Sequence, residues 1–328
     1  MVRFGVVGTN WITEAFLKAA AQLEDFRLTA VYSRTEERAK EFAGKYGADK
    51  IFTDLETMAK SGEIDAVYIA SPNSLHAEQA IIFMNNKVHV LCEKPIASNT
   101  KELRKMIDAA KENHVLLMEA LKSTFLPNFK AVKENLHKIG QVRRYFASYC
   151  QYSSRYDAYR QGTVLNAFKP ELSNGSLMDI GIYCVYPLVT LFGKPAEIKA
   201  TGYRLESGVD GEGSIVLTYP DMDAVVIYSK IANSSLPAEI QGEDGNIVID
   251  KIHTPEKVEL HYRSGEQEDL TQKQLSDSMY YEAKEFIELI KAGKTESDIN
   301  SFSNSMITME IIEEARKQIG VIYPADQK

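Results

Sequence analysis

The sequence predicts an α/β protein in which an N-terminal doubly wound parallel sheet is followed by an α+β domain with an open, largely antiparallel sheet. Strand-like apolar runs alternate with helical stretches five times within roughly the first 120 residues, the pattern of parallel strands joined by crossover helices. After Pro127 short alternating runs follow one another with Gly, Pro and Asp turns between them. Two domains also fit a chain of 328 residues.

The composition excludes several classes of protein. With 38 Lys and Arg against 46 Asp and Glu, the chain has a net charge of −8, so no nucleic-acid or anionic-membrane partner is expected. Cys92, Cys150 and Cys184 are far apart and are expected to be reduced thiols of a cytoplasmic protein. The spacing of Cys and His predicts no metal site. No uninterrupted apolar run approaches the roughly 18 residues that span a bilayer, which predicts a soluble protein.

The first strand, residues 2–7, leads into a glycine turn and an apolar-periodic helix, residues 15–23. Strand, turn and helix open a dinucleotide-binding Rossmann unit, in which the helix N-terminus holds the pyrophosphate. Of the G-x-G-x-x-G pattern only Gly8 is present, because Asn10 and Thr13 take the other places. Asn tolerates a left-handed backbone, but it puts a side chain where the pyrophosphate should approach the main chain. The candidate cofactor residues of this turn are Gly8, Thr9, Asn10, Trp11 and Ile12.

The second strand, residues 28–32, is followed by basic residues. Arg34 lies 26 residues after Gly8, close to where NAD-binding sites place an acid on the ribose 2′-hydroxyl, and no acid occurs here. Ser33, Arg34 and Arg38 could instead receive the 2′-phosphate of NADP. NADP is therefore favoured; the alternative is that Arg34 is a solvated loop residue and the site also takes NAD.

A third strand, residues 64–70, ends in Ser-Pro-Asn-Ser before a helix. This order places Ser71, Asn73 and His76 at the carboxyl end of a parallel strand, where cofactor can be contacted. The alternative for His76 is an ordinary residue in the first turn of a helix.

A fourth strand begins at Val88 and ends in a charged pair, Glu93 and Lys94, stopped by Pro95. Charged residues are costly to bury, so the pair should lie at the carboxyl mouth of the strand, where open parallel sheets bind ligands. These three residues are therefore candidates for contact with the cofactor. The alternative is a surface ion followed by a turn proline.

The fifth strand, residues 115–120, ends the first domain, so the predicted domains are residues 1–122 and 123–328, with a hinge near 121–127. The last helix could pack back towards the first domain. In the second domain the predicted helices are 128–138, 176–191, 280–291 and 303–319. The predicted strands are 141–152, 198–204, 214–219, 224–230, 238–241, 247–249 and 257–262.

The predicted helix 176–191 carries Asp179 and Tyr183, which are four residues apart and so share one helical face. An Asp in an apolar helix is expensive unless it is paired or used. Gly181 in mid-helix suggests that something approaches closely there. The alternative is an Asp favoured by the helix dipole, with Tyr183 as a core residue.

Four motifs occur in order along essentially the whole chain: the glycine turn, Glu93-Lys94-Pro95, Met118-Glu119-Ala120 and the run from Pro170 to Tyr183. Together they resemble the glucose-fructose oxidoreductase, inositol dehydrogenase and MocA (Gfo/Idh/MocA) family. The resemblance implies a Rossmann domain carrying NAD(P), a second domain with an open sheet, and a substrate pocket between them. It also implies that Lys94 is the catalytic lysine, that Pro95 shapes the turn beside the nicotinamide, and that Asp179 binds substrate.

Many members of that family have His at the position of Tyr183. A Tyr at this position is similar to the dihydrodiol and xylose dehydrogenase branch, in which the tyrosine is the acid/base. The chain departs from the pattern at Asn10, at Thr13, and at Lys122-Ser123-Thr124, where that branch has an aromatic residue and an Arg. The first two leave the details of the phosphate loop open, and the third leaves the substrate open.

These residues together predict an NADP-dependent oxidoreductase acting on a secondary alcohol, hemiacetal or ketone of a sugar-like or polyol molecule. Tyr183 would exchange the hydroxyl proton, and Lys94 would stabilise the phenolate, since a free phenol ionises only near pH 10, and would polarise a carbonyl. Asp179 would orient a substrate hydroxyl or hold Lys94. Rival functions are a cofactor-binding regulator without turnover and a glycosidase-like hydrolase using bound NAD.

Two further predictions concern surfaces of the second domain. Four residues between Tyr152 and Asn166 suit either a polyhydroxylated ligand or a partner subunit: Arg155, Tyr156, Tyr159 and Arg160. The sheet of this domain is expected to form a homodimer or homotetramer.

Overall fold

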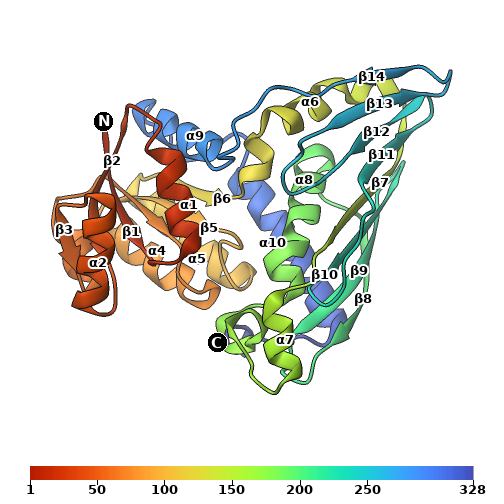
Figure 1. Ribbon diagram of the computed structural model, residues 1–328. Coiled ribbons are helices and arrows are strands. Elements are labelled where there is room, and N and C mark those ends of the chain that lie inside the picture. Colours follow the sequence, from red (N-terminus) through yellow and green to blue (C-terminus); the bar gives the residue numbers. More distant parts are fainter. Residues whose placement is uncertain (328) are drawn as a thin grey trace. The chain divides into compact units, whose positions relative to one another are not determined.

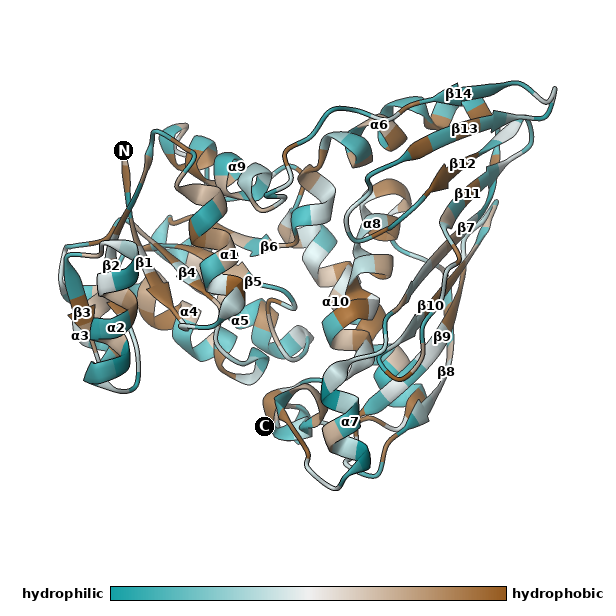
Figure 2. Ribbon diagram, viewed as in Figure 1, coloured by the Kyte–Doolittle hydropathy of each residue, from teal (hydrophilic) through white to brown (hydrophobic). Residues whose placement is uncertain are grey.

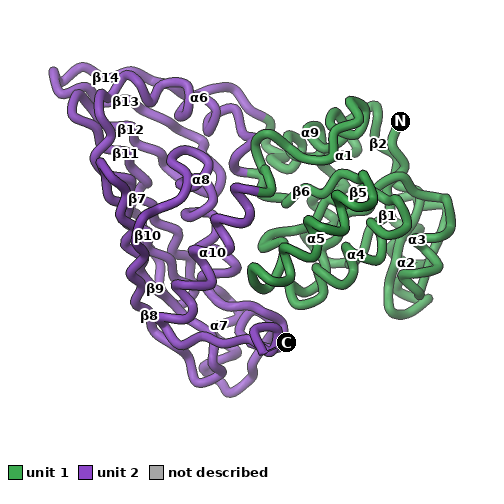
Figure 3. Tube along the Cα trace, turned by 180° about the vertical axis from the view of Figure 1, so that it is seen from behind, with its two compact units in different colours: residues 1–122, 275–302 green, residues 123–274, 303–328 purple. Residues whose placement is uncertain are grey.

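The computed structural model describes residues 1–327 and forms two compact units (Figures 1 and 3). Unit 1 contains residues 1–122 and 275–302, and unit 2 contains residues 123–274 and 303 onward. The single boundary predicted after residue 122 leaves out the return of 275–302 to unit 1. The last helix, Phe302–Ile319, belongs to unit 2 apart from its first residue.

Unit 1 is built on a six-stranded sheet in the order β3-β2-β1-β4-β5-β6, and every pair in it is parallel. The strands are β1 (Val2–Val7), β2 (Phe26–Tyr32), β3 (Lys50–Phe52), β4 (Ala66–Ile69), β5 (His89–Glu93) and β6 (Leu117–Ala120). This is the predicted doubly wound Rossmann sheet. The prediction of five strands missed β3, which has only three residues. The strand order reverses at β1 and β4, the position at which such sheets form a ligand crevice.

The helices of unit 1 each bury apolar residues, and four of the six begin at a polar side-chain cap. They are α1 (Trp11–Ala20), α2 (Glu36–Tyr46), α3 (Leu55–Lys60), α4 (His76–Asn85), α5 (Thr100–Asn113) and α9 (Tyr280–Lys291), with the 3-10 turn Asn73–Leu75. Another 3-10 turn, Lys122–Phe125, begins at the last residue of the stretch 1–122 and continues into unit 2. Asn10, Thr35, Asp54 and Asn99 accept hydrogen bonds from the first turns of α1, α2, α3 and α5. In Figure 2 α2 is mostly hydrophilic, as expected of a helix with one face in solvent.

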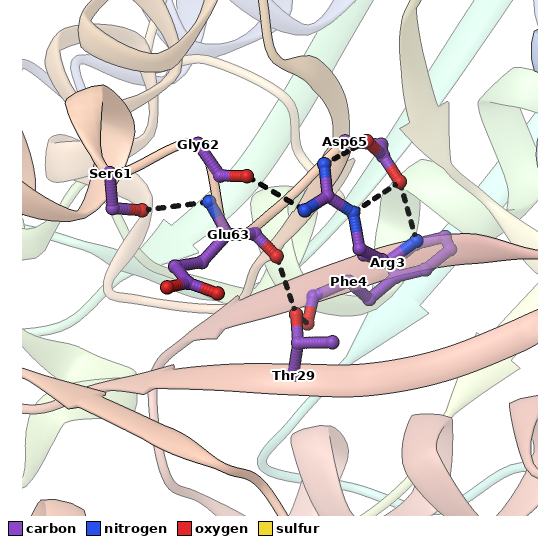
Figure 4. A network of polar contacts seen from close by, with 7 residues as sticks. All are labelled: Arg3, Phe4, Thr29, Ser61, Gly62, Glu63 and Asp65. Atoms are coloured by element: carbon purple, nitrogen blue, oxygen red, sulfur yellow. Dashed lines mark hydrogen bonds and ion pairs between the residues drawn. The ribbon is translucent and has the colours of Figure 1, made fainter.

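A polar network ties the amino ends of the central strands (Figure 4). The Arg3 guanidinium donates to both carboxylate oxygens of Asp65, at 3.1 and 2.6 Å, and to the carbonyl of Gly62 at 2.7 Å. The Thr29 hydroxyl donates to the carbonyls of Phe4 and Glu63, each at 3.1 Å. These contacts fix β1, β2 and the start of β4 at the edge opposite to the glycine turn.

Unit 2 is built on an eight-stranded mixed sheet in the order β14-β13-β12-β11-β7-β10-β9-β8. The strands are β7 (Val142–Cys150), β8 (Glu197–Arg204), β9 (Asp210–Thr218), β10 (Asp223–Ser229), β11 (Ala238–Gly242), β12 (Gly245–Ile249), β13 (Val258–Tyr262) and β14 (Gln267–Asp269). Only β7 and β10 pair in parallel; the other neighbours are antiparallel. This confirms the predicted open, largely antiparallel sheet.

Helices cover one face of the unit 2 sheet. They are α6 (Pro127–Asn135), α7 (Ser154–Arg160), α8 (Ile182–Phe192) and α10 (Phe302–Ile319), with 3-10 turns at Leu136–Ile139, Asn166–Phe168, Pro170–Leu172 and Pro324–Gln327. A π-helical turn, Leu177–Gly181, precedes α8, where the sequence predicted one continuous α-helix. A Cβ on Gly181 would lie 3.0 Å from the Tyr228 ring, so the close approach predicted at Gly181 is made by β10.

The stretch Pro170–Phe192 is long and apolar enough to cross a membrane. The sequence was expected to contain no such run. It is interrupted by turns, and 72% of its most apolar window is buried inside the structure. It is therefore a core segment of unit 2.

Candidate active site

The candidate residues form two groups, one in unit 1 and one in unit 2. In unit 1, the turns that follow β1, β4 and β5 carry Gly8, Ser71 and Lys94. These strands are neighbours in a parallel sheet, so their carboxyl ends lie at one edge.

Gly8 has a φ of +104°, a conformation that L side chains rarely adopt. A Cβ at this position would lie only 2.6 Å from the carbonyl oxygen of Ala70. The turn after β1 therefore runs against the end of β4, where a residue with a side chain would not fit.

Asn10 is the N-cap of α1 in an extended conformation, with φ −107°, so the left-handed backbone considered for it is not used. Its Oδ1 accepts from the backbone N–H groups of Ile12 and Thr13, at 3.1 and 3.2 Å. Its Nδ2 donates to the carbonyl of Ala70 at 2.8 Å. The amide is thus turned onto the helix start and the end of β4, where it ties the two together.

Arg38 reaches from α2 to the glycine turn. Its guanidinium donates to the hydroxyl and the carbonyl oxygen of Thr9, at 3.1 and 2.7 Å, and to Glu41 at 2.8 Å. Ser33 and the exposed Arg34 follow β2, and the Ser33 N–H donates to the carbonyl of Phe52 at 3.1 Å. A fixed cation therefore stands beside the turn at which a dinucleotide would bind.

His76 is buried and faces backbone carbonyls with both ring nitrogens: Nε2 lies 2.8 Å from Ser71 O and Nδ1 lies 2.9 Å from Pro95 O. Burial, assisted by the charge of Lys94, holds the pKa of His76 below its usual value, so the neutral ring donates to one carbonyl at a time. His76 joins the turns after β4 and β5. Asn73 begins the 3-10 turn just before it, and the Lys94-Pro95 peptide bond is cis.

Glu93 is buried at the end of β5, and burial raises the pKa of its carboxyl. The Tyr68 hydroxyl donates to it at 2.5 Å and the Lys94 N–H at 3.3 Å. Sequence reasoning missed the fully buried Glu282 of α9, whose carboxyl pKa is raised well above its usual value by burial and by the nearby charge of Glu93. A Glu on the apolar face of the predicted helix 280–291 was the available signal. Lys94 is thus the half-buried end of a strand that rests on buried carboxyl groups.

In unit 2, Asp179 lies in the π-helical turn and Tyr183 is the second residue of α8. The Asp179 carboxylate pairs with the Lys230 ammonium, which directly follows β10. Sequence reasoning missed Lys230; the signal was a lysine at the end of the apolar run 224–230. Asp179 therefore has a cationic partner within its own unit. Its expected roles, orienting a substrate hydroxyl or holding Lys94, stay predictions.

Tyr183 is half-buried beside two rings that sequence reasoning also missed. The rings of Tyr149 and His253 stack at 4.1 Å, and Tyr183 meets them edge-on at 5.9 and 6.3 Å. No motif pointed to either ring, because strand β7 and the loop after β12 are far from α8 in sequence. The phenol is oriented by its packing against them.

The residues proposed for a polyhydroxylated ligand lie on α7, Ser154–Arg160. Tyr156 and Tyr159 stack at 5.8 Å, and both rings contact Phe168, at 5.9 and 5.5 Å. The Tyr159 hydroxyl also accepts from the Ser207 N–H at 2.9 Å. These two rings are therefore part of the packing of unit 2.

Comparison with known families identifies both halves of the chain. Residues 2–121 match the oxidoreductase family with an NAD-binding Rossmann fold, and residues 129–248 match the GFO/IDH/MocA C-terminal domain. The chain belongs to the Gfo/Idh/MocA family. It is an NAD(P)-dependent oxidoreductase acting on CH–OH groups, which confirms the resemblance found in the motifs.

Two curated relatives cover the chain throughout. The scyllo-inositol 2-dehydrogenase (NADP(+)) IolU of Bacillus subtilis (strain 168) is 64% identical over 327 residues, covering 100% of both chains. The trans-1,2-dihydrobenzene-1,2-diol dehydrogenase of Danio rerio is 32% identical, covering 100% of this chain and 99% of its own. The predicted likeness to the dihydrodiol dehydrogenases is confirmed, but it is the more distant of the two.

Solved structures show the same fold. The 3-ketoreductase KijD10 from Actinomadura kijaniata, in complex with NADP and TDP-benzene, has a TM-score of 0.85 at 23% identity, covering 98% of this chain and 99% of its own. The aldose-aldose oxidoreductase from Caulobacter crescentus, complexed with glycerol, has a TM-score of 0.86 at 21% identity, covering 97% of each chain. At these identities the likeness concerns the fold alone.

Proposed function

We propose that the protein is an NADP-dependent dehydrogenase that oxidises scyllo-inositol, or a cyclic polyol closely similar to it, to the corresponding ketone. The observation that carries the proposal is the full-length identity of 64% to a scyllo-inositol 2-dehydrogenase (NADP(+)). The site residues of this chain supply the physical support.

The residues at the carboxyl edge of the unit 1 sheet fit NADP. The Gly8 turn, packed against the end of β4, leads into the N-terminus of α1, and a helix N-terminus favours a phosphate group. Gly8, Thr9, Asn10, Trp11 and Ile12 would hold the pyrophosphate. Three residues would hold the 2′-phosphate: Ser33, Arg34 and Arg38. Guanidinium groups pair well with phosphate, and the acid that NAD-binding sites place on the ribose 2′-hydroxyl does not occur after β2. Ser71, Asn73, His76, Glu93, Lys94 and Pro95 would frame the nicotinamide end.

A nicotinamide cofactor held there would supply the hydride acceptor for oxidation of the carbinol carbon. The Tyr183 phenolate would take the hydroxyl proton and become a phenol, and the positive charge of the Lys94 ammonium would stabilise that phenolate before the transfer. Asp179 would accept a hydrogen bond from a second hydroxyl group of the polyol and so orient the inositol ring. Because scyllo-inositol carries a hydroxyl on every ring carbon, such a contact is available whichever carbon reacts.

The outward face of the unit 2 sheet supports a homodimer or homotetramer. Val225 of β10 lies opposite Phe146 of β7 and Val216 of β9, and Val216 is 42% exposed. An apolar cross-strand patch of this kind is typical of an association surface. A sedimentation mass near the monomer value of 36.8 kDa would contradict this part of the proposal, and Val216→Glu is expected to dissociate the oligomer.

The three free cysteines, with Cys92 and Cys184 buried, support a place in the reducing cytoplasm.

A panel of polyols tests the proposed activity. Purified protein is supplied with NADP⁺ or NAD⁺ and with scyllo-inositol, myo-inositol, xylose or glucose, and nicotinamide absorbance is followed. The proposal expects turnover with scyllo-inositol and a higher kcat/KM with NADP⁺. Cofactor binding without turnover of any polyol would favour a regulator. In a parallel reaction with an aryl glycoside in place of the polyol, hydrolysis with no net formation of NADPH would favour the hydrolase.

A further inference from the structure

Lys230 directly follows β10 and is buried although it carries a charge. Its side chain is 5% exposed and its ammonium contacts Oδ2 of Asp179. The ammonium also lies 5.6 Å from the centroid of the Phe168 ring, within cation–π range. The backbone is held as well, because the Lys230 N–H donates to Gly211 O at 2.9 Å and its carbonyl accepts from the Ser153 N–H at 2.9 Å. Both ends of this residue are therefore fixed.

The two partners of this ion pair differ in exposure. The Asp179 side chain is 32% exposed, against 5% for Lys230. An ammonium that has lost its water needs a counter-charge, whereas a carboxylate with access to solvent has other partners. In this pair the Lys230 ammonium is buried and held in place, whereas the Asp179 carboxylate is partly accessible to solvent.

The backbone under Asp179 is anchored independently. The Asp179 N–H donates to Gly175 O at 3.2 Å, and the Leu177 N–H donates to Oδ2 of Asp210 at 2.6 Å. A Cβ on Gly175 would overlap Oδ1 of Asp210, so this turn fits closely against the start of β9. The hydrogen bonds of the turn restrain the backbone of Asp179, and the contact with Lys230 restrains Oδ2 of its carboxylate.

An ionised, oriented carboxylate is a selective partner for hydroxyl groups. It can only accept hydrogen bonds, and a polyol offers O–H donors on adjacent carbons. Hydrogen bonds to a charged group are also stronger than those between neutral groups. A lysine that holds such a carboxylate in position would therefore affect how strongly it binds the neighbouring hydroxyl groups of a polyol.

We propose that Lys230 is a specificity-determining positioning residue. It holds the Asp179 carboxylate where this group accepts a hydrogen bond from a hydroxyl adjacent to the reacting carbon of a polyol. This inference rests on the proposed function, and it gives Lys230 no part in hydride or proton transfer. It predicts that removing the charge of Lys230 weakens the binding of polyols and spares substrates that lack the neighbouring hydroxyl.

The test compares Lys230→Met with the wild type. Met keeps most of the chain that packs on Phe168 and removes the ammonium. Lys194→Met is the matched control, because Lys194 forms an exposed pair with Glu310 at 2.7 Å in the same unit. KM and kcat are measured for scyllo-inositol and for its deoxy analogue lacking the hydroxyl next to the reacting carbon. Calorimetry measures binding of the same two compounds to the NADPH-saturated protein, so that binding is followed without turnover.

For Lys230→Met we expect KM and Kd for scyllo-inositol to rise about 10- to 100-fold, the effect of losing a hydrogen bond to a charged group. We expect changes of less than about threefold for the deoxy analogue, for kcat and for NADPH affinity, and none in Lys194→Met. Equal losses for both compounds, or a loss confined to kcat, would overturn the inference.

Two further results keep failures apart. If Lys230→Met does not fold, the double variant Lys230→Met/Asp179→Asn removes both charges together; it is expected to fold and to lose the preference for scyllo-inositol over the deoxy analogue, and keeping the preference would overturn the inference. If the wild type binds scyllo-inositol but does not oxidise it, the proposed function fails while the binding comparison still decides the role of Lys230. If it does neither, both fail.

Discussion

Asp210 carries a pH-dependent cost that can be measured. This carboxyl begins β9 and is fully buried. Its Oδ2 accepts from the Leu177 N–H at 2.6 Å, and among the described residues Oδ1 has no hydrogen-bond partner. Burial raises the pKa of Asp210 from 3.8 to about 6, although the Leu177 hydrogen bond and the charges of Arg316 and Lys230 oppose the shift.

The sign of the effect follows from linkage. A raised carboxyl pKa means that the folded state keeps its proton to higher pH than the unfolded state does, so the free energy of unfolding falls as pH rises from about 3.8 to about 6. The difference of about two pKa units corresponds to roughly 3 kcal/mol, lost in full above pH 6. About 2 kcal/mol of it falls between pH 4.5 and 7.5.

Asp210→Asn tests this value, because Asn keeps an oxygen that can accept from Leu177 and cannot ionise. Urea unfolding of both proteins is measured across pH 4.5 to 7.5. The free energy of unfolding of the variant minus that of the wild type should increase by about 2 kcal/mol over this range. Asp221→Asn, at an exposed position, is the control and should give a constant difference. If the free energy of unfolding of Asp210→Asn minus that of the wild type stays constant or decreases with pH, the pKa of Asp210 is not raised in the folded protein.

Three other predictions concern the candidate site. Tyr183→Phe and Lys94→Ala should each lower kcat for scyllo-inositol by about 100-fold or more while NADPH still binds, as followed by fluorescence titration; near-normal rates would remove that residue from the mechanism. Arg38→Ala should raise the Kd for NADPH about 10-fold relative to that for NADH, because a charged contact with the 2′-phosphate is lost, and equal losses would count against NADP preference. Asp179→Asn should lower the free energy of unfolding by about 3 kcal/mol, since the buried Lys230 ammonium loses the carboxylate that contacts it and only the nearby charge of Asp210 remains. Urea unfolding of Lys230→Met, which leaves a partly exposed carboxylate, should show a smaller loss, and the reverse order would be inconsistent with the burial of the pair.

Much of unit 1 could be predicted because its signals are local. The glycine turn at Gly8 and the charged end of β5 each follow from a few consecutive residues. The cap made by Asn10 was not predicted. Strand β3 was missed because three residues give too little period to detect. The role of the Asn10 amide depends on Ala70, a partner 60 residues away, which no local pattern reveals.

The electrostatic partners of the site were harder to predict for the same reason. Lys230 meets Asp179 across 51 residues of sequence, and Glu282 is buried near Glu93 although α9 is far along the chain. Each was visible in sequence only as a charged residue at the end of an apolar run or on an apolar helix face. The π-helical turn before α8 also escaped, because a single wide turn barely changes the helical spacing of Asp179 and Tyr183.

Isotope transfer shows whether a carbinol carbon of the polyol delivers its hydride to NADP⁺. scyllo-Inositol deuterated at its ring carbons is incubated with the protein and NADP⁺, and the recovered cofactor is examined by mass spectrometry and NMR. Hydride transfer from a carbinol carbon predicts one deuterium at C4 of the nicotinamide in every NADPH formed. NADPH without deuterium, or inositol consumed with no NADPH produced, would contradict the account.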